Sequence, residues 1–348
     1  MMNKINTHIV GTESIRAYGF ACIINLGKLR EMRRLTVVAI NDVYELTNFS
    51  RLKSLIRDVR DSRSNPVLAC LAGDFLAPSI LSSMDKGLGV VECLNSLGIS
   101  HVCFGNHEGD HGLEVLKKRI EEFSGMWLNS NVRSLPYDGL HEYDVIDCGE
   151  GGRAGILGFI SDEKGMFRGD TFRNYNIEPV ASTAIELIDR LRSEHDVETI
   201  VPMTHQSMEY DIALAQKLKC PIILGGHDHE EYCEEVGPTT IVKAGQDAHT
   251  AVVIDLAWNS STEVEKKIEF VPVHSYEPDE EMQRLVDSHM HVVKQLEGEI
   301  IVKYPNPLSS RNMRREQTSI GTVYTFFVSL LTNIHVTTNP FTRNTYTC

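Results

Sequence analysis

Apolar residues alternate between short continuous runs and helically spaced stretches from residue 35 onward. Amphipathic spacing predicts helices at 48–61, 78–97, 112–123, 180–193 and 207–218. The continuous runs predict strands at 35–40, 66–72, 100–104, 126–132, 153–160, 198–204, 221–224, 239–244 and 250–256. This order is typical of an α/β fold with a largely parallel sheet, or sheets, covered by helices.

Polar side chains follow five of these predicted strands at the point where each strand ends. Because the carboxyl ends of parallel strands meet at one edge of a sheet, we expect these side chains to lie together. A single such residue is usually a helix cap, a turn residue or a structural histidine. Five strand ends with the same character indicate a site instead. The polar residues at these ends are Asn41 and Asp42, Asp74, the run 105–110 (GNHEGD), His205 and the run 225–230 (GGHDHE).

Asp, Asn and His side chains supply the oxygen and nitrogen atoms that divalent metals accept. The set is too large for one tetrahedral ion and suits a pair of ions that share a bridging carboxylate. Two such ions can hold a hydroxide and clamp the oxygens of an in-line phosphoryl displacement. The pattern therefore predicts a dinuclear metal site.

The net charge of −14 counts against nucleic-acid binding through a basic face. It leaves a phosphorylated small molecule open as a substrate, because bound metal supplies local positive charge.

No stretch reaches the roughly 18 apolar residues of a transmembrane segment. The apolar stretch 17–27 is short and lacks a small-residue cleavage site, so no signal peptide is predicted. The eight cysteines form no close pairs, which is typical of reduced thiols and favours a cytoplasmic location.

Five sequence blocks occur in one order: AINDVYEL, LAGDFLAPS, FGNHEGD, MTHQSMEYD and GGHDHE. Together they resemble the calcineurin-like metallophosphoesterase superfamily, and within it the 5′-nucleotidase branch, over about residues 35–275. The resemblance implies a four-layer α/β/β/α sandwich. It also implies a dinuclear metal-dependent hydrolase of phosphomonoesters, above all nucleotides, that acts through in-line attack of a metal-bound hydroxide.

The resemblance implies six metal ligands among these polar residues, with Asp74 bridging two divalent ions (zinc, manganese, magnesium or iron). The first ion would be held by Asp42, Asp74 and His229. The second ion would be held by Asp74, Asn106, His205 and His227. His107 would stabilise the substrate phosphate or protonate the leaving oxygen, and Asp110 would orient the His107 ring. The sequence identifies no substrate-binding residues.

Tyr44 is the position at which this chain departs from the family pattern, where a histidine is a ligand of the first metal. A phenol has a pKa near 10 and is a poor ligand for Mg²⁺ or Zn²⁺ at neutral pH. Three interpretations follow: Tyr44 binds an unusual metal such as ferric iron, it leaves the first site weaker, or it disables that site. We favour the second, because three ligands remain.

The chain divides into four predicted segments. Residues 1–34 are a poorly ordered extension, 35–275 the catalytic domain, and 276–306 a linker helix. Residues 307–348 resemble the start of a nucleotidase C-terminal domain, followed by an atypical tail. Because 317–348 contain neither Asp nor Glu, we expect that domain to be truncated.

Two alternative functions remain open from the sequence. One is a phosphatase or phosphodiesterase of broader specificity. The other is a non-catalytic binding protein whose metal site is impaired by Tyr44. The sequence leaves the oligomeric state open.

Overall fold

The computed structural model describes residues 32–135, 137–163, 165–167, 171–260, 263–298, 307–309 and 318–332. Residues 1–31 of the predicted extension and residues 333–348 of the predicted tail lie outside the described residues. The chain forms two compact units, Met1–Ser288 and His289–Cys348. The predicted domain boundaries at 35, 276 and 307 stay predictions.

The first sheet has seven strands, and β1 to β5 within it run parallel to one another. Its strands, in spatial order, are β13 (Glu263–Pro272), β12 (Thr250–Ser260), β1 (Arg33–Ile40), β2 (Val67–Leu71), β3 (His101–Cys103), β4 (Met126–Leu128) and β5 (Leu140–His141). The strands β12 and β13 close one edge in antiparallel register. The helices along this part of the chain are α1 (Phe49–Asp61), α2 (Ile80–Asp85), α3 (Leu88–Leu97) and α4 (Leu113–Glu122).

The second sheet has six strands around a parallel centre. In spatial order they are β10 (Glu231–Val236), β11 (Thr239–Ala244), β9 (Ile222–Gly225), β8 (Thr199–His205), β7 (Arg153–Ile160) and β6 (Tyr143–Asp147). The edge strand β10 pairs with β11, and the opposite edge strand β6 pairs with β7, both in antiparallel register. The helices α5 (Val180–His195) and α6 (Met208–Leu218) belong to this half.

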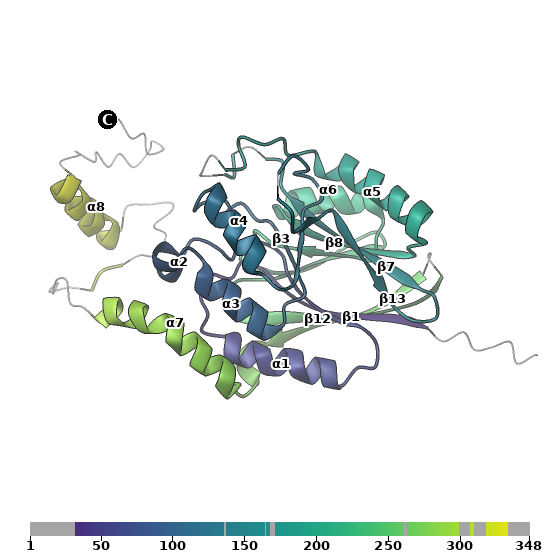
Figure 1. Ribbon diagram of the computed structural model, residues 1–348, viewed down its shortest axis with the longest axis horizontal. Coiled ribbons are helices and arrows are strands. Elements are labelled where there is room, and N and C mark those ends of the chain that lie inside the picture. The colour runs from purple at the N-terminus through teal and green to yellow at the C-terminus, as the bar shows by residue number, and fades with distance from the viewer. Residues whose placement is uncertain are drawn as a thin grey trace, which may run out of the picture. The chain divides into compact units, whose positions relative to one another are not determined.

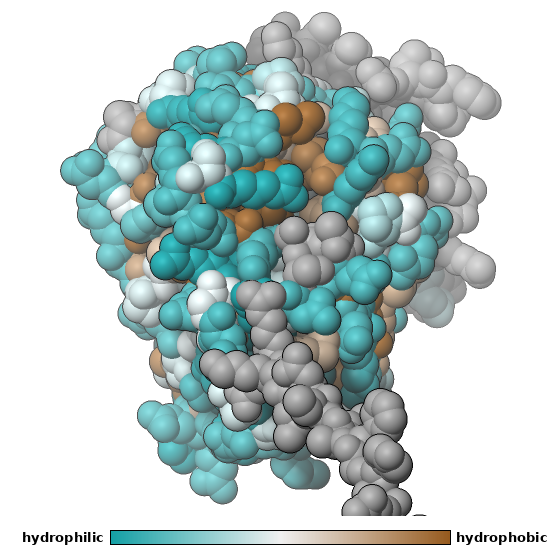
Figure 2. Space-filling view, turned by 90° about the vertical axis from the view of Figure 1, so that its right-hand side faces the viewer, coloured by the Kyte–Doolittle hydropathy of each residue, from teal (hydrophilic) through white to brown (hydrophobic). Residues whose placement is uncertain are grey.

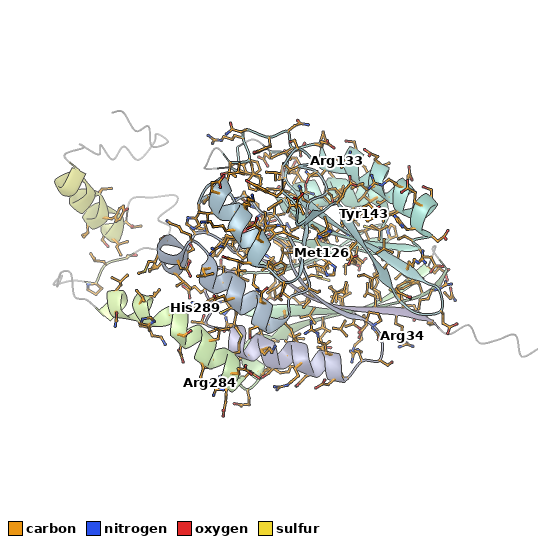
Figure 3. The ribbon with its side chains drawn as sticks, viewed as in Figure 1. Arg34, Met126, Arg133, Tyr143, Arg284 and His289 are labelled. Atoms are coloured by element: carbon orange, nitrogen blue, oxygen red, sulfur yellow. The ribbon has the colours of Figure 1, made fainter. Side chains whose placement is uncertain are left out.

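The two sheets pack face to face and the helices cover their outer faces. Figure 1 shows α5 and α6 on one side of the sheets and α1 and α3 on the other. Buried residues of both sheets, among them Leu128, Met203 and Trp258, form one apolar cluster between them. The side chains of Arg133 and Tyr143 contact α5, through Glu186 at 3.1 Å and His195 at 3.0 Å (Figure 3). The predicted four-layer α/β/β/α sandwich is confirmed.

Element boundaries differ from the prediction at one helix, at β4, which ends at Leu128 rather than at 132, and at the sheet edges. The predicted helix 78–97 is two helices, because Lys86 and Gly87 adopt φ of 59° and 80° and interrupt it. The strands β5, β6 and β10 were not predicted; β10 and β6 are partly exposed and lack a continuous apolar run.

The chain continues through the short 3₁₀ helix η1 (Val273–Ser275) to α7 (Glu280–Gly298) and α8 (Ser319–Thr332). The start of α7 is anchored on α1, since the Ser50 hydroxyl donates to Gln283 Oε1 at 2.8 Å and Arg57 pairs with Asp279 at 3.1 Å. No helix in the described part of the chain has the length and apolar character needed to cross a membrane. Figure 2 shows one face on which hydrophilic side chains predominate.

Candidate metal centre

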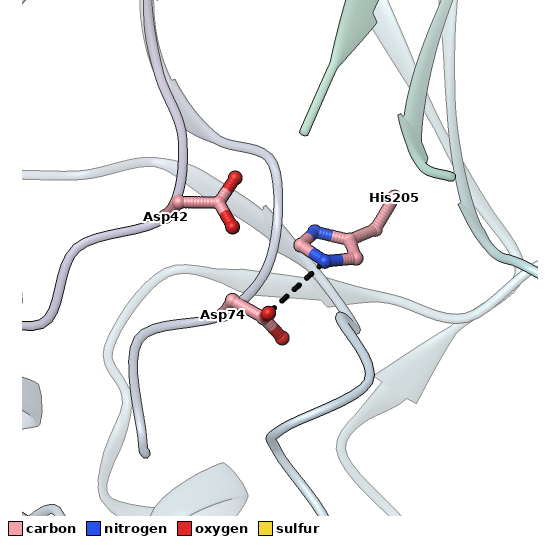
Figure 4. Close-up of side chains that lie close together, drawn as sticks. All are labelled: Asp42, Asp74 and His205. Carbon is pink, nitrogen blue, oxygen red and sulfur yellow. Dashed lines mark ion pairs between the residues drawn. The ribbon is translucent and has the colours of Figure 1, made fainter. Parts of the chain in front are cut away.

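The six predicted ligands lie at the carboxyl ends of strands from both sheets. Asp42 and Asp74 follow β1 and β2, Asn106 follows β3, and His205 ends β8. The ligand atoms of Asp42, Asp74 and His205 lie within 4.8 Å of one another, and all three residues are buried (Figure 4). Because the two sheets face each other, residues that are far apart in the sequence lie together at one rim.

Three of the predicted ligands have a backbone conformation that side chains disfavour. The φ angles are 53° at Asp42, 55° at Asp74 and 74° at His227. For residues other than glycine this left-handed region costs about 1–3 kcal/mol, and it persists where the surroundings enforce it. Such residues cluster at functional sites, which is consistent with a ligand role for these three.

Asn106 lies between two imidazole rings of the second sheet. Its Oδ1 is 3.2 Å from His205 Nε2 and 3.1 Å from His227 Nδ1. His205 Nδ1 donates to the carbonyl oxygen of Ala72 at 2.8 Å, so Nε2 is the ring nitrogen available to bind a metal ion. His205 Nε2 is also 3.2 Å from Asp74 Oδ2. The four residues predicted for the second ion are therefore linked in one chain of contacts, from Asp74 through His205 and Asn106 to His227.

The hydroxyl of Tyr44 lies among the three residues predicted for the first ion. It is 3.0 Å from Asp42 Oδ1, 3.3 Å from Asp74 Oδ2 and 3.1 Å from His229 Nε2. Burial and the charges of the two carboxylates raise the pKa of Tyr44 far above its ordinary value, which keeps the phenol neutral. The structure thus places the Tyr44 hydroxyl at the centre of the predicted first site.

His107 and Asp110 form a hydrogen-bonded pair beside the centre. His107 Nδ1 is 2.7 Å from Asp110 Oδ2, and the His107 backbone N–H donates to Asp74 Oδ1 at 2.8 Å. Burial lowers the pKa of His107, but the hydrogen bond to Asp110 and the charge of Asp74 outweigh it, so the pKa is raised. The catalytic role predicted for this pair stays a prediction.

The electrostatics of the centre fit bound cations. Asp42 and Asp74 are 0% and 1% exposed, and two buried carboxylates at this distance repel each other unless positive charge lies between them. Burial opposes a charge on His205, yet these two carboxylates raise its pKa to about 10. A donor set of carboxylate, amide and imidazole groups in so negative a field suits divalent metal ions.

Two residues outside the predicted set hold the Asp42 loop in place. Asn41 donates from Nδ2 to Asp42 Oδ2 at 2.7 Å, and its Oδ1 accepts from the Ala244 N–H at 2.7 Å. Asp247 Oδ1 accepts from the Tyr44 N–H at 2.8 Å. Asn41 is adjacent to the predicted ligand Asp42, so its role at the site could have been inferred from the sequence. Asp247 lies about 200 residues away from Asp42, and nothing in the sequence indicated its role.

Glu108 supports the Asp74 loop from within the protein. It is 1% exposed and accepts the backbone N–H groups of Asp74 at 2.9 Å, Phe75 at 2.8 Å and Leu76 at 3.2 Å. Burial and the nearby Asp74 carboxylate raise the pKa of Glu108 to about 7. Because both carboxylate oxygens accept backbone hydrogen bonds, Glu108 is a structural residue of the site.

The sequence matches a family model and several curated proteins. The model described as calcineurin-like phosphoesterase matches residues 35–231. A 5′-nucleotidase of Bos taurus is 28% identical over 206 residues, which is 57% of this chain and 35% of that protein. The trifunctional nucleotide phosphoesterase protein YfkN of Bacillus subtilis is 21% identical over 335 residues. That match covers 82% of this chain and 23% of the YfkN protein. The chain thus spans about a third or less of these relatives.

Solved structures share the fold. A 5′-nucleotidase precursor from Thermus thermophilus superposes with a TM-score of 0.73 at 17% identity, covering 86% of this chain and 67% of its own. The calcineurin-like phosphoesterase YfkN from Bacillus subtilis superposes with a TM-score of 0.64 at 16% identity, covering 76% of this chain and 98% of that chain. At these identities the likeness concerns the fold.

Proposed function

The chain belongs to the calcineurin-like phosphoesterase family, and from that premise we propose that it is a dinuclear metal-dependent hydrolase of phosphomonoesters, with nucleotides as its substrate class. The observation that carries the proposal is the convergence of six donor side chains from five strand ends at one rim. The nucleotide class rests on the relatives, whose names describe nucleotidases.

Six side chains would hold the two divalent ions. Asp42, Asp74 and His229 would hold the first, and Asp74, Asn106, His205 and His227 the second. Bound there, the ions would neutralise the phosphoryl oxygens and supply a nucleophile at neutral pH. Asp74 faces both sets, since its Oδ2 contacts both the Tyr44 hydroxyl and His205 Nε2.

His107 acts on the leaving group in this proposal. Its Nδ1 is engaged by Asp110 Oδ2, which fixes the ring and leaves Nε2 as the nitrogen that faces a substrate. A proton on Nε2 would pass to the leaving oxygen as the ester bond breaks. Asp110 acts only through His107, as a positioning residue.

A second candidate, a binding protein without catalysis, is favoured by the contacts of Tyr44. Its hydroxyl engages all three residues proposed for the first ion, which opposes metal binding at that site. A chain that holds one ion would still bind a phosphorylated ligand through the positive charge of that ion.

Elemental analysis of the purified chain, paired with a substrate panel, tests both proposals. The panel comprises nucleoside monophosphates, cyclic nucleotides, an aryl phosphate and a phosphopeptide. Two metal equivalents with phosphate release from the nucleoside monophosphates are expected. Release from every phosphomonoester alike would favour a broad phosphatase. One equivalent or none, with no release, would favour the binding role.

A further inference from the structure

Lys243 is a fully buried cation in the second sheet. It belongs to β11, in which all six residues are buried, and its side chain is 0% exposed. A buried ammonium group costs several kcal/mol unless its charge and its protons find partners. The contacts of Lys243 Nζ therefore decide what this residue does.

The ammonium group is satisfied by three hydrogen bonds and by ion pairs with Asp228 and Asp211. Nζ donates to the carbonyl oxygens of Gln206 and Gly226 and to Asp228 Oδ2, each at 2.8 Å. These three bonds use its three protons. Asp211 Oδ2 lies 2.8 Å from the same Nζ and balances the charge.

The partners of Lys243 adjoin the three predicted histidine ligands. Gln206 follows His205, Gly226 precedes His227, and Asp228 stands between His227 and His229. One buried side chain thus ties together the two loops, after β8 and β9, that carry these imidazoles.

Asp211 extends the same network along α6. Its Oδ1 accepts from Thr204 Oγ1 at 2.7 Å and from Gln206 Nε2 at 2.9 Å. Gly225 leaves room for the pair, since a Cβ there would lie 2.7 Å from Lys243 Cε and 2.9 Å from Asp211 Oδ2. The Lys243–Asp211 pair is therefore closely packed against Gly225.

We propose that Lys243 is a positioning residue for the metal centre, which holds His205, His227 and His229 in a geometry ready to bind metal. The proposal rests on the metal binding in the proposed function. Lys243 contacts no predicted ligand side chain and acts through the backbone carbonyls of Gln206 and Gly226 and the carboxylate of Asp228 beside them. Outer residues that orient metal ligands typically change metal affinity by about 10- to 100-fold.

Metal affinity separates this role from a contribution to stability alone. Isothermal titration of manganese(II) into the metal-stripped full chain would be run for wild type, Lys243→Met and Lys243→Met/Asp211→Asn. The double variant removes the buried carboxylate charge that the single change leaves unpaired. Arg33→Met is the control, because it breaks another largely buried ion pair, with Glu198 at 2.8 Å, at the start of β1 and away from the rim.

We expect both Lys243 variants to bind manganese at least about tenfold more weakly, while Arg33→Met loses thermal stability but binds as wild type does. If Lys243→Met does not fold, the double variant decides. A folded double variant with wild-type affinity would overturn the proposal. If the wild type binds metal but hydrolyses no phosphomonoester, the proposed activity fails and this inference stands; a wild type that binds no metal overturns both.

Discussion

Tyr44 stands at the position where the family resemblance predicts a histidine ligand of the first metal. Its hydroxyl engages all three side chains proposed for the first ion. Replacing Tyr44 with histidine would exchange a neutral phenol for an imidazole donor. We expect Tyr44→His to tighten metal binding at the first-ion site by about tenfold or more, measured by titration calorimetry. We also expect it to raise kcat/KM, measured by phosphate release.

Tyr44→Phe is the matched control for this prediction. It removes the hydroxyl without adding a ligand, so any gain in affinity should be smaller than that of Tyr44→His. Loss of activity in both variants would contradict the weakened-site interpretation and give the phenol a role of its own.

Most of the candidate site was predictable at this scale, because donor residues that follow predicted strands form a pattern visible in the sequence. The supporting contacts were not. Asp247 and Lys243 reach the site from positions about 200 residues after Asp42, and only the folded sheets bring them there.

Helix α1 is tied to the first sheet by a charged contact beyond its C-terminal end. Arg63 pairs with Asp255 of β12 through Nε–Oδ1 at 3.0 Å and Nη2–Oδ2 at 2.9 Å, and the Thr36 hydroxyl donates to Asp255 Oδ1 at 2.7 Å. The hydrogen bonds from Arg63 lower the pKa of Asp255 although burial opposes them.

The lowered pKa gives Asp255 a pH signature. A carboxyl group whose pKa is lowered by folding stabilises the fold above its unfolded pKa, about 3.9, and that stabilisation is lost as pH falls through the folded pKa. We expect Asp255→Asn to lower the free energy of unfolding by about 1 kcal/mol at pH 7 and by less near pH 2. Urea unfolding at both pH values measures this.

Asp58→Asn provides the control on α1. The Asp58 side chain is 57% exposed and 3.8 Å from Arg57, so its replacement should leave the free energy of unfolding nearly unchanged. An Asp255 variant with the same loss of stability at pH 2 and pH 7 would show that the pairing is not the cause.

At the level of elements, the buried strands and long amphipathic helices were predictable because their apolar periodicity is strong. The break between α2 and α3 was missed because the apolar periodicity continues across Lys86 and Gly87, although Gly87 was a signal for an interruption. The edge strands β6 and β10 were missed because their partly exposed residues follow no apolar run.

The whole sandwich depends on how closely its two sheets approach. A Cβ built on Gly158 of β7 would lie 2.4 Å from Leu128 Cβ and 3.0 Å from Cys103 Cβ, both in the opposite sheet. We expect Gly158→Ala to destabilise the fold by about 1–3 kcal/mol, because the sheets must shift to admit one methyl group. Chemical denaturation measures this loss.

Gly165→Ala is the control for sheet spacing, since a Cβ at Gly165 meets nothing within 4 Å. It should change the free energy of unfolding by less than about 0.5 kcal/mol. Equal effects at the two glycines would mean that sheet contact is not what Gly158 serves.

The central claim is that the rim of the two sheets is a metal-dependent phosphoesterase site built around Asp74. The most direct test is phosphate release from a nucleoside monophosphate by metal-replete wild type and Asp74→Ala, with circular dichroism to verify folding. We predict a folded variant whose turnover falls by at least about a hundredfold. Turnover retained near the wild-type rate in folded, metal-replete Asp74→Ala would contradict the account.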